Sequence, residues 1–330
     1  MPERIIAAAA VSVIAFFTVF FLTPVLIRAL EKRNLTVKDY NRKGGAMVPR
    51  PGGISIIVGI IAAELVVFGF FPRVEILAIM ITTSLAFLVG LVDDIRVMGG
   101  WFKPLALAAS AIPIILLGAY DFNLAFPLFG EVRIPLLYFG IIIFMITVTG
   151  NTVNSIDVLN GVSSGFMTIA SFALTISLFL LQNYEIAIAS LPLGFVALAF
   201  YKYHKFPSKI FPGDSGVLAL GGMYGAIAIV GDVEIIAAVA LLPAIFNSFL
   251  FLSSMKRITE HREIKSKPVN TEEDFRLKAT PHKDAPVTLV RLIVAGEPLT
   301  EKQVGYVIFR LAIFSGILAI ITAFMTGVVI

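Results

Sequence analysis

The stretch FLVGLVDDIRVMGGWFK (Phe87–Lys103) ends an apolar run in two adjacent aspartates, Asp93 and Asp94, and places a single lysine nine residues later. A charged side chain is costly inside a bilayer and tolerated at its edge. The two aspartates therefore fit the end of a membrane-spanning helix, provided that the rest of the chain is built to cross a membrane. Their position along the membrane normal decides what chemistry is open to them.

The composition of the whole chain indicates that it is built to cross a membrane. Of 330 residues, 58% are hydrophobic and only 15% are charged, and the mean hydropathy is +0.93. Soluble domains carry about a quarter charged residues. The sequence therefore predicts an all-α, polytopic membrane protein, and the absence of cysteine excludes disulfide bonds.

Apolar segments long enough to span a bilayer as helices, roughly 17–25 residues each, can be marked along the chain. The ten segments are 5–30, 53–71, 76–92, 104–120, 134–152, 161–181, 186–201, 216–231, 234–255 and 304–328. An even number of spans puts both termini on the same side of the membrane. We therefore expect about ten transmembrane helices in a single domain covering residues 1–330.

The basic residues predict the orientation of these helices. Loops on one side carry 21 Lys and Arg residues, whereas the loops and terminus on the other side carry three. Cytoplasmic loops of membrane proteins are enriched in Lys and Arg. The asymmetry predicts that both termini lie outside. Because the basic residues are spread by loop and form no patch, we do not expect the chain to bind nucleic acid.

Two loops show patterns of their own. Residues 121–133 alternate apolar and polar residues around a glycine, which favours a short hairpin on the outer side. Residues 256–303 form the only sizeable polar stretch, and a structureless loop of this length would be unusual. We expect this segment to fold over the cytoplasmic face.

Four polar clusters remain, and all of them fall on the predicted cytoplasmic side. They are Asp93-Asp94 with Lys103, NTVNSIDVLNG (151–161), FPGDSG (211–216) and TPHKDAP (280–286). A transporter would instead favour ionisable groups near the midplane on broken helices. The placement indicates chemistry at the inner surface of the membrane.

The residue types in these clusters narrow that chemistry. Carboxylates gathered at one face imply a cation, and oxygen ligands without cysteine or clustered histidine favour a hard ion such as Mg²⁺. Magnesium in turn favours substrates with phosphate oxygens, which lysine and histidine would help to hold. The sequence predicts metal-assisted chemistry on a phosphorylated substrate.

The same clusters, preceded by KDYNRKGGAMVPRPGG (38–53), resemble the polyprenyl-phosphate N-acetylhexosamine-1-phosphate transferase superfamily over nearly the whole chain. The resemblance implies an enzyme that moves a sugar 1-phosphate from a UDP-sugar to a lipid phosphate and releases UMP. It implies Mg²⁺ as the cofactor, with Mn²⁺ as an alternative, and leaves a homodimer open. Residues 256–303 would then form a cytoplasmic substrate loop.

The resemblance also implies roles for individual residues. It assigns catalytic roles to Asp93, Asp94 and Lys103, with Asp93 as a candidate base for the lipid phosphate. It assigns the metal to Asn154 and Asp214, the uracil to Asn160 and Phe211, and a place in the pocket to Asn151.

The last cytoplasmic loop bears on the branch of the superfamily. It holds His282 beside Lys283 instead of a run of histidines, which is most similar to the dolichyl-phosphate branch of archaea and eukaryotes. That branch implies transfer from UDP-N-acetylglucosamine to polyprenyl or dolichyl phosphate in the cell membrane, or in the endoplasmic reticulum of a eukaryote. The reaction would begin lipid-linked oligosaccharide assembly for glycosylation, with His282 and Lys283 contacting the sugar or diphosphate.

Several alternatives stay open at this stage. Another UDP-N-acetylhexosamine could be the donor, for cell-wall or surface polysaccharide, and a transporter of an anionic substrate is the more distant alternative. Lys43 fits equally a topology-setting charge and the mouth of the site, and Asp157 fits a structural hydrogen bond about as well as a pocket role. Glu64 lies in the middle of a span, where an ionisable group is by default a candidate functional residue, and where the structural alternative is a side chain that is protonated or paired inside the bundle.

Overall fold

The computed structural model describes residues 2–40, 45–96, 99, 101–255 and 266–327. Within these ranges, eight helices are long and apolar enough to cross a membrane, or nine if a bent pair is taken as one span. The eight are α1 (Pro2–Lys32), α2 (Gly53–Phe70), α3 (Val74–Ile95), α6 (Pro135–Ile156), α7 (Val162–Leu180), α8 (Tyr184–His204), α9 (Gly213–Val230) and α13 (Glu301–Gly327). The prediction of an all-α, multi-pass membrane protein is confirmed.

The other two predicted spans are broken helices. Residues 104–120 form α4 (Phe102–Ala109) and α5 (Ile112–Leu117), and residues 234–255 form α10 (Glu234–Ala240) and α11 (Leu242–Met255), which meet at 75°. A proline, Pro113 or Pro243, is the second residue of the later helix in each pair. Proline lacks an N–H and clashes with the carbonyl four residues earlier, so each helix breaks before it.

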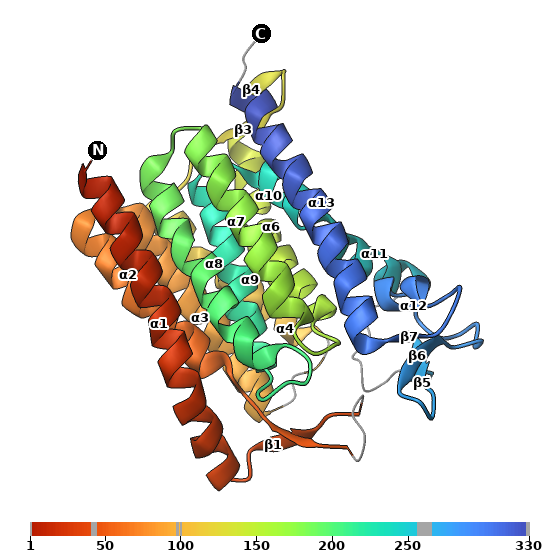
Figure 1. The fold of residues 1–330 in the computed structure, drawn as a ribbon. Coiled ribbons are helices and arrows are strands. Elements are labelled where there is room, and N and C mark those ends of the chain that lie inside the picture. Colours follow the sequence, from red (N-terminus) through yellow and green to blue (C-terminus); the bar gives the residue numbers. More distant parts are fainter. Residues whose placement is uncertain (1, 41–44, 97–98, 100, 256–265, 328–330) are drawn as a thin grey trace.

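Short strands lie at both ends of the helical bundle (Figure 1). The predicted hairpin in 121–133 is confirmed as β3 (Asn123–Phe126) paired with β4 (Gly130–Arg133), in register from Asn123 with Arg133 to Phe126 with Gly130. At the opposite end, β1 (Thr36–Lys38) pairs with β2 (Met47–Pro49), with Val37 opposite Val48.

The long polar segment is folded where the structure describes it. A three-stranded antiparallel sheet joins β5 (Val269–Thr271), β6 (Arg276–Ala279) and β7 (Leu299–Thr300), with the short helix α12 (Leu289–Ile293) between the last two strands. Both described ends of the chain, α1 and α13, begin or finish at the end of the bundle that carries β3 and β4 (Figure 1). That arrangement agrees with an even number of crossings, whereas the assignment of either end to the cytoplasm stays a prediction.

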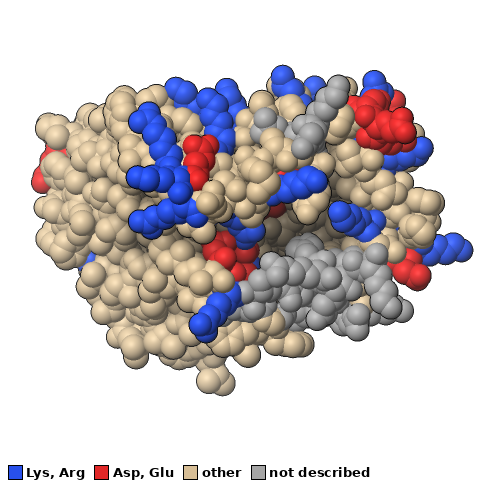
Figure 2. All heavy atoms as spheres, turned by 90° about the horizontal axis from the view of Figure 1, so that it is seen from below, with Lys and Arg blue, Asp and Glu red and all other residues tan. Residues whose placement is uncertain are grey.

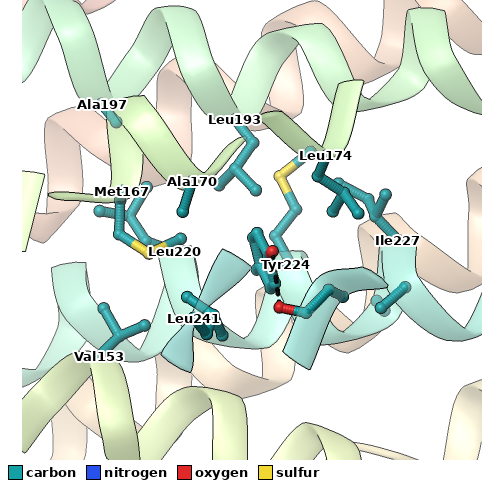
Figure 3. Packing of buried hydrophobic residues seen from close by; sticks show 14 of the residues in the cluster. Val153, Met167, Ala170, Leu174, Leu193, Ala197, Leu220, Tyr224, Ile227 and Leu241 are labelled. Atoms are coloured by element: carbon teal, nitrogen blue, oxygen red, sulfur yellow. Dashed lines mark hydrogen bonds between the residues drawn. The ribbon is translucent and has the colours of Figure 1, made fainter. Parts of the chain in front are cut away.

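The core of the bundle surrounds α9. Its spanning window is 94% buried, against 22% for α1 and 33% for α13, so α9 is enclosed by other helices and the terminal helices face lipid. Figure 3 shows side chains from α7 and α8 packed around Leu220, Tyr224 and Ile227 of α9. The Tyr224 hydroxyl donates a hydrogen bond to the carbonyl of Ala237 at 3.0 Å, which satisfies the one polar group of that side chain.

Glu64 of α2 is fully buried, and neither carboxylate oxygen has a hydrogen-bond partner among the described residues. An unpaired carboxylate charge inside a membrane protein is costly. Of the two structural forms considered from the sequence, the protonated side chain fits this environment and the paired one does not.

Candidate active site

Two segments far apart in the sequence meet backbone to backbone at the β1–β2 end of the bundle. The amides of Gly52 and Gly53 donate to the carbonyls of Phe211 and Pro212, both at 2.8 Å, and the Phe211 amide donates to Pro49 at 3.0 Å. A Cβ on Gly53 would lie 2.4 Å from the Gly216 nitrogen, so only glycine allows this approach. The contact sets the loop after β2 against the start of α9.

Helix α3 approaches the same start of α9 just as closely. A Cβ on Gly90 would lie 2.4 Å from the Asp214 carbonyl oxygen and 2.6 Å from the Cα of Ser215. With only a hydrogen at this position, the backbones can touch, as small residues allow at helix interfaces in membranes. The last turn of α3, which carries Asp93 and Asp94, is therefore held beside Asp214.

Six side chains gather at this junction, and we call them the site cluster. Its members are Arg50, Asp93, Asp94, Lys103, Asn154 and Asp214. They lie at the end of the bundle viewed in Figure 2, where Lys and Arg side chains surround acidic ones. The sequence predicts five of the six members as site residues, and the structure brings those five together.

Asp94 closes the amino end of α9. Its Oδ1 accepts from the Asp214 amide at 2.9 Å, and its Oδ2 accepts from the amide and hydroxyl of Ser215 at 2.9 and 2.6 Å. Arg50 adds two further bonds to Oδ1, at 2.8 and 3.2 Å, and the Asp94 side chain is only 2% exposed. Asp94 therefore satisfies the free N–H groups of a helix end, as a capping residue does.

Asp93 faces a different set of groups. Its Oδ2 accepts from Lys103 Nζ at 3.1 Å, and the same Nζ donates to Asp214 Oδ1 at 2.6 Å. With the Asn154 amide oriented so that both of its atoms have partners, its nitrogen donates to Asp214 Oδ1 at 2.8 Å and its oxygen accepts from Lys103 at 3.0 Å. Lys103 thus joins Asp93, Asp214 and Asn154 in one polar contact.

Arg50 is the member of the site cluster that the sequence does not single out. Its Nη2 donates to Asp94 Oδ1 at 2.8 Å and to Asp214 Oδ2 at 2.9 Å, so one guanidinium bridges two carboxylates and offsets one of their two charges. In the sequence Arg50 is one of six basic residues in 31–52 and reads as a topology charge. Only its placement before the paired glycines Gly52 and Gly53, which lie against FPGDSG, distinguishes it.

The donor set of the cluster fits a magnesium ion. Asp93, Asp214 and Asn154 offer carboxylate and amide oxygens, and Mg²⁺ in proteins is commonly held by one or two carboxylates together with water and substrate phosphate. Among the described residues, no three His, Cys, Asp or Glu side chains are grouped as a complete metal site. A magnesium ion at this cluster stays a prediction, with Asp214 and Asn154 as the residues that would hold it.

The residues predicted to hold uracil are placed less simply. Asn160 is 9% exposed, and its amide nitrogen donates to Glu301 at 2.6 Å and to Asp39 at 3.2 Å, while its oxygen accepts from the Ser208 amide at 3.1 Å. In this arrangement the Asn160 side chain joins three segments of the protein. Phe211 is half-buried and meets the His204 ring edge-on at 6.1 Å.

The other predicted residues are not joined to the cluster by the bonds that the structure describes. The Asn151 amide donates to the Thr147 carbonyl of its own helix at 2.8 Å. In the described part of the chain, no hydrogen bond or ion pair joins His282 or Lys283 to the site cluster. Lys43 lies outside the described residues.

Asp157 lies in a largely buried polar group beside the cluster, and its side chain is 18% exposed. Its Oδ1 accepts from the Ser163 hydroxyl at 2.5 Å, and His204 Nε2 lies 3.8 Å away. Burial raises the pKa of Asp157 from 3.8 to about 7, because the hydrogen bond from Ser163 offsets only part of the cost of desolvating the charge.

This pKa predicts a pH dependence of stability. A carboxyl group whose pKa is higher in the folded state binds protons more tightly when folded, so stability is fully present below pH about 4 and declines as pH rises to about 7. We expect Asp157→Asn to lose less thermal stability than the wild type between pH 5 and pH 8. Thermal unfolding in detergent at both pH values measures this, with exposed Asp284→Asn as the control. Equal pH dependence in wild type and Asp157→Asn would contradict the expectation.

Comparison with known proteins identifies the family. Residues 76–232 match the model described as glycosyl transferase family 4. A phospho-N-acetylmuramoyl-pentapeptide-transferase of Bacillus licheniformis is 30% identical over 252 residues, which are 69% of this chain and 76% of that protein. The chain belongs to glycosyl transferase family 4. This family membership favours a transferase over the transporter considered from the sequence.

Two archaeal relatives extend the likeness. A candidate UDP-N-acetylglucosamine–dolichyl-phosphate N-acetylglucosaminephosphotransferase of Saccharolobus solfataricus is 26% identical over 331 residues, covering 99% of this chain and all of that protein. A protein of the same description from Sulfolobus acidocaldarius is 28% identical over 233 residues, covering 66% and 70%. The resemblance drawn from the sequence motifs is thus confirmed at the level of the superfamily.

Proposed function

We propose that the protein transfers N-acetylglucosamine 1-phosphate from UDP-N-acetylglucosamine to a polyprenyl or dolichyl phosphate, releasing UMP. The observation that carries the proposal is the site cluster, which gathers three carboxylates, two cations and an amide at one end of a membrane-spanning bundle. At such an end, the headgroup of a lipid phosphate and a soluble nucleotide sugar can meet. The names of the two archaeal relatives support this donor and acceptor.

In the proposed reaction, an oxygen of the lipid phosphate attacks the sugar-bearing phosphorus of the donor. The bond from that phosphorus to the UMP oxygen breaks, and UMP leaves with the bonding electrons. Positioning and charge neutralisation supply most of the catalysis in phosphoryl transfer. A route through a covalent aspartyl intermediate would give the same products. Single-turnover trapping of that intermediate distinguishes it from direct attack by the lipid phosphate.

The contacts of the site cluster suggest a separate role for each of its members. Asp93, which accepts a hydrogen bond from Lys103, would accept a proton from the lipid phosphate. Lys103 and Arg50 carry the positive charge that would hold phosphate oxygens, Arg50 with a planar fork and Lys103 as a point charge. Mg²⁺ held by Asp214 and Asn154 would neutralise the diphosphate and the leaving UMP, and Mn²⁺ has similar ligand preferences.

A second donor is favoured by a specific finding. The relative from Bacillus licheniformis is named for transfer of a phospho-N-acetylmuramoyl-pentapeptide, so relatives of this chain are named for different donors. Competition between UDP-N-acetylglucosamine and other UDP-N-acetylhexosamines in one assay separates these alternatives.

The direct test is an assay of the purified protein with radiolabelled UDP-N-acetylglucosamine and polyprenyl phosphate. We expect label in the organic phase together with an equimolar amount of UMP. Because the diphosphate charge needs a cation, EDTA is expected to lower the rate at least about a hundredfold, and added Mg²⁺ to restore it. Transfer that persists in EDTA would reject the metal, and silence with every UDP-sugar would reject the proposed reaction.

A further inference from the structure

Arg291 of α12 organises the segment that contains His282. Its Nη1 donates to the carbonyls of Ala285 and Pro286 at 2.6 and 3.2 Å, and its Nη2 donates to those of Thr280 and His282 at 3.1 and 3.0 Å. One side chain thus binds four carbonyl groups within seven residues. The segment 280–286 is wrapped around this guanidinium.

The contacts of Arg291 leave its terminal guanidinium hydrogens unavailable to a substrate. A guanidinium has four hydrogens on its two terminal nitrogens, and here all four point at backbone carbonyls. These hydrogens are therefore not free for a phosphate or sugar. Lysine has three donors around one point and lacks the planar fork, so it would not reproduce the set.

Asn247 of α11 connects α12 to the helix that carries the asparagine motif. Its Oδ1 accepts from the amide of Leu289, the first residue of α12, at 2.8 Å. Its Nδ2 donates to the carbonyl and hydroxyl of Ser155 at 3.0 and 3.2 Å, and Ser155 also bonds Ser248 at 2.8 Å. Asn247 is only 5% exposed, so each of these bonds is made away from water.

The two sets of contacts form one connection across the face of the protein. Ser155 is the neighbour of Asn154 in the site cluster, and Leu289 lies two residues before Arg291. The break at Pro243 turns α11 by 75° from α10, and α11 then runs beside α6 and α13. The segment with His282 is thereby fixed relative to α6, although nothing in the sequence links the two.

We propose that Arg291 and Asn247 are positioning residues that hold segment 280–286 in register with the site cluster, so that His282 is presented to the sugar diphosphate of the donor. The proposal rests on the proposed function for the identity of that donor. Neither residue touches substrate. Both act through the backbone of the segment.

A double-mutant cycle tests whether Arg291 acts through His282. We expect Arg291→Met and His282→Ala each to raise the KM for the UDP-sugar about tenfold, with the KM for lipid phosphate unchanged. The double variant is then expected to lose about tenfold as well, because the second change removes a contact already lost. A loss of about a hundredfold in the double variant would overturn the proposal. Arg291→Lys is expected to recover only part of the activity, and Asn247→Leu to behave like Arg291→Met.

A second measurement does not depend on activity. The chain has no cysteine, so Asp284→Cys provides a single site for a spin label on the segment. We expect Arg291→Met to increase the mobility of that label, and the control Arg276→Met, which removes an exposed arginine paired with Asp274, to leave it unchanged. An unchanged spectrum in Arg291→Met would overturn the positioning role.

The two measurements separate the possible failures. If the wild type transfers nothing from any UDP-sugar, the proposed function fails while the label still decides whether Arg291 holds the segment. If the wild type is active and the label is loosened, an additive cycle shows that Arg291 does not act through His282 and overturns the proposal.

Discussion

Asp93→Asn is expected to lower sugar-phosphate transfer by about 10²–10⁴-fold while leaving the folded protein almost as stable as the wild type. The side chain accepts from Lys103, whereas the bonds from the amides of Asp214 and Ser215 at the start of α9 go to Asp94. Asparagine keeps the shape of the side chain and removes the charge and the basic oxygen. The rate with saturating UDP-sugar and lipid phosphate, together with thermal unfolding in the same detergent, measures both parts.

Asp94→Asn is the matched control, since it is the same change at the neighbouring residue. Here the new amide group would face the Ser215 amide or the Asp214 amide, and the pairing with Arg50 would weaken. An unsatisfied buried group costs about 1–3 kcal/mol, so we expect a clear fall in unfolding temperature along with lost activity. Equal unfolding temperatures for the two variants would contradict the division of roles between the two aspartates.

The second large effect is expected at a glycine. Gly90→Ala would place a methyl group 2.4 Å from the carbonyl oxygen of Asp214, a backbone atom that cannot rotate away. The helices α3 and α9 would have to separate, at a cost of about 1–3 kcal/mol. Since the site cluster is built across this contact, we expect transfer activity to fall by at least about a hundredfold. Activity and the apparent unfolding temperature in detergent measure the change.

Gly140→Ala supplies the control for this substitution. Gly140 also lies within a spanning helix, α6, but a Cβ there would meet nothing within 4 Å. Alanine is a better helix former than glycine by about 1 kcal/mol, so this variant is expected to keep full activity and equal or higher stability. A Gly140→Ala variant as damaged as Gly90→Ala would show that the α3–α9 contact is not the cause.

The sequence predicts the helical architecture well because long apolar runs leave few alternatives in a membrane. It misses the two helix breaks, although Pro113 and Pro243 are visible in the sequence and each follows the end of a helix by a few residues. Spans assigned from apolar composition alone take no account of a single proline. The missing N–H of proline and the steric clash of its ring nevertheless break the helix.

The site is predicted in its members and not in its internal arrangement. Asp93, Lys103, Asn154 and Asp214 stand out as polar residues at predicted helix ends, and the structure brings them together. The separate contacts of Asp94, by contrast, depend on an approach between residues 120 positions apart. The place of Arg50 depends on a similar long-range approach, which no local pattern encodes.

The position of segment 280–286 is likewise not predictable from local sequence. The sequence marks His282 by its residue type, but its direct contacts run to Thr280, Ala285 and Arg291 and not to the carboxylates. Whether it reaches the donor depends on α11 and α12, whose bend and hydrogen bonds arise only in the folded chain.

The burial of α9 has a consequence for how the protein is made. Of the eight spanning helices, α9 is the least apolar and the most enclosed, so on its own it is the weakest candidate for partition from the insertion machinery into lipid. Its neighbours α3, α6, α7 and α8 precede it in the chain and are synthesised first. During synthesis, α9 can therefore pack against these helices instead of being exposed to lipid. Because α9 carries Asp214, the site cluster is complete only once α9 has packed. In a chain truncated before α9, the Asp94 carboxylate would lack the Asp214 and Ser215 groups that it binds in the complete protein.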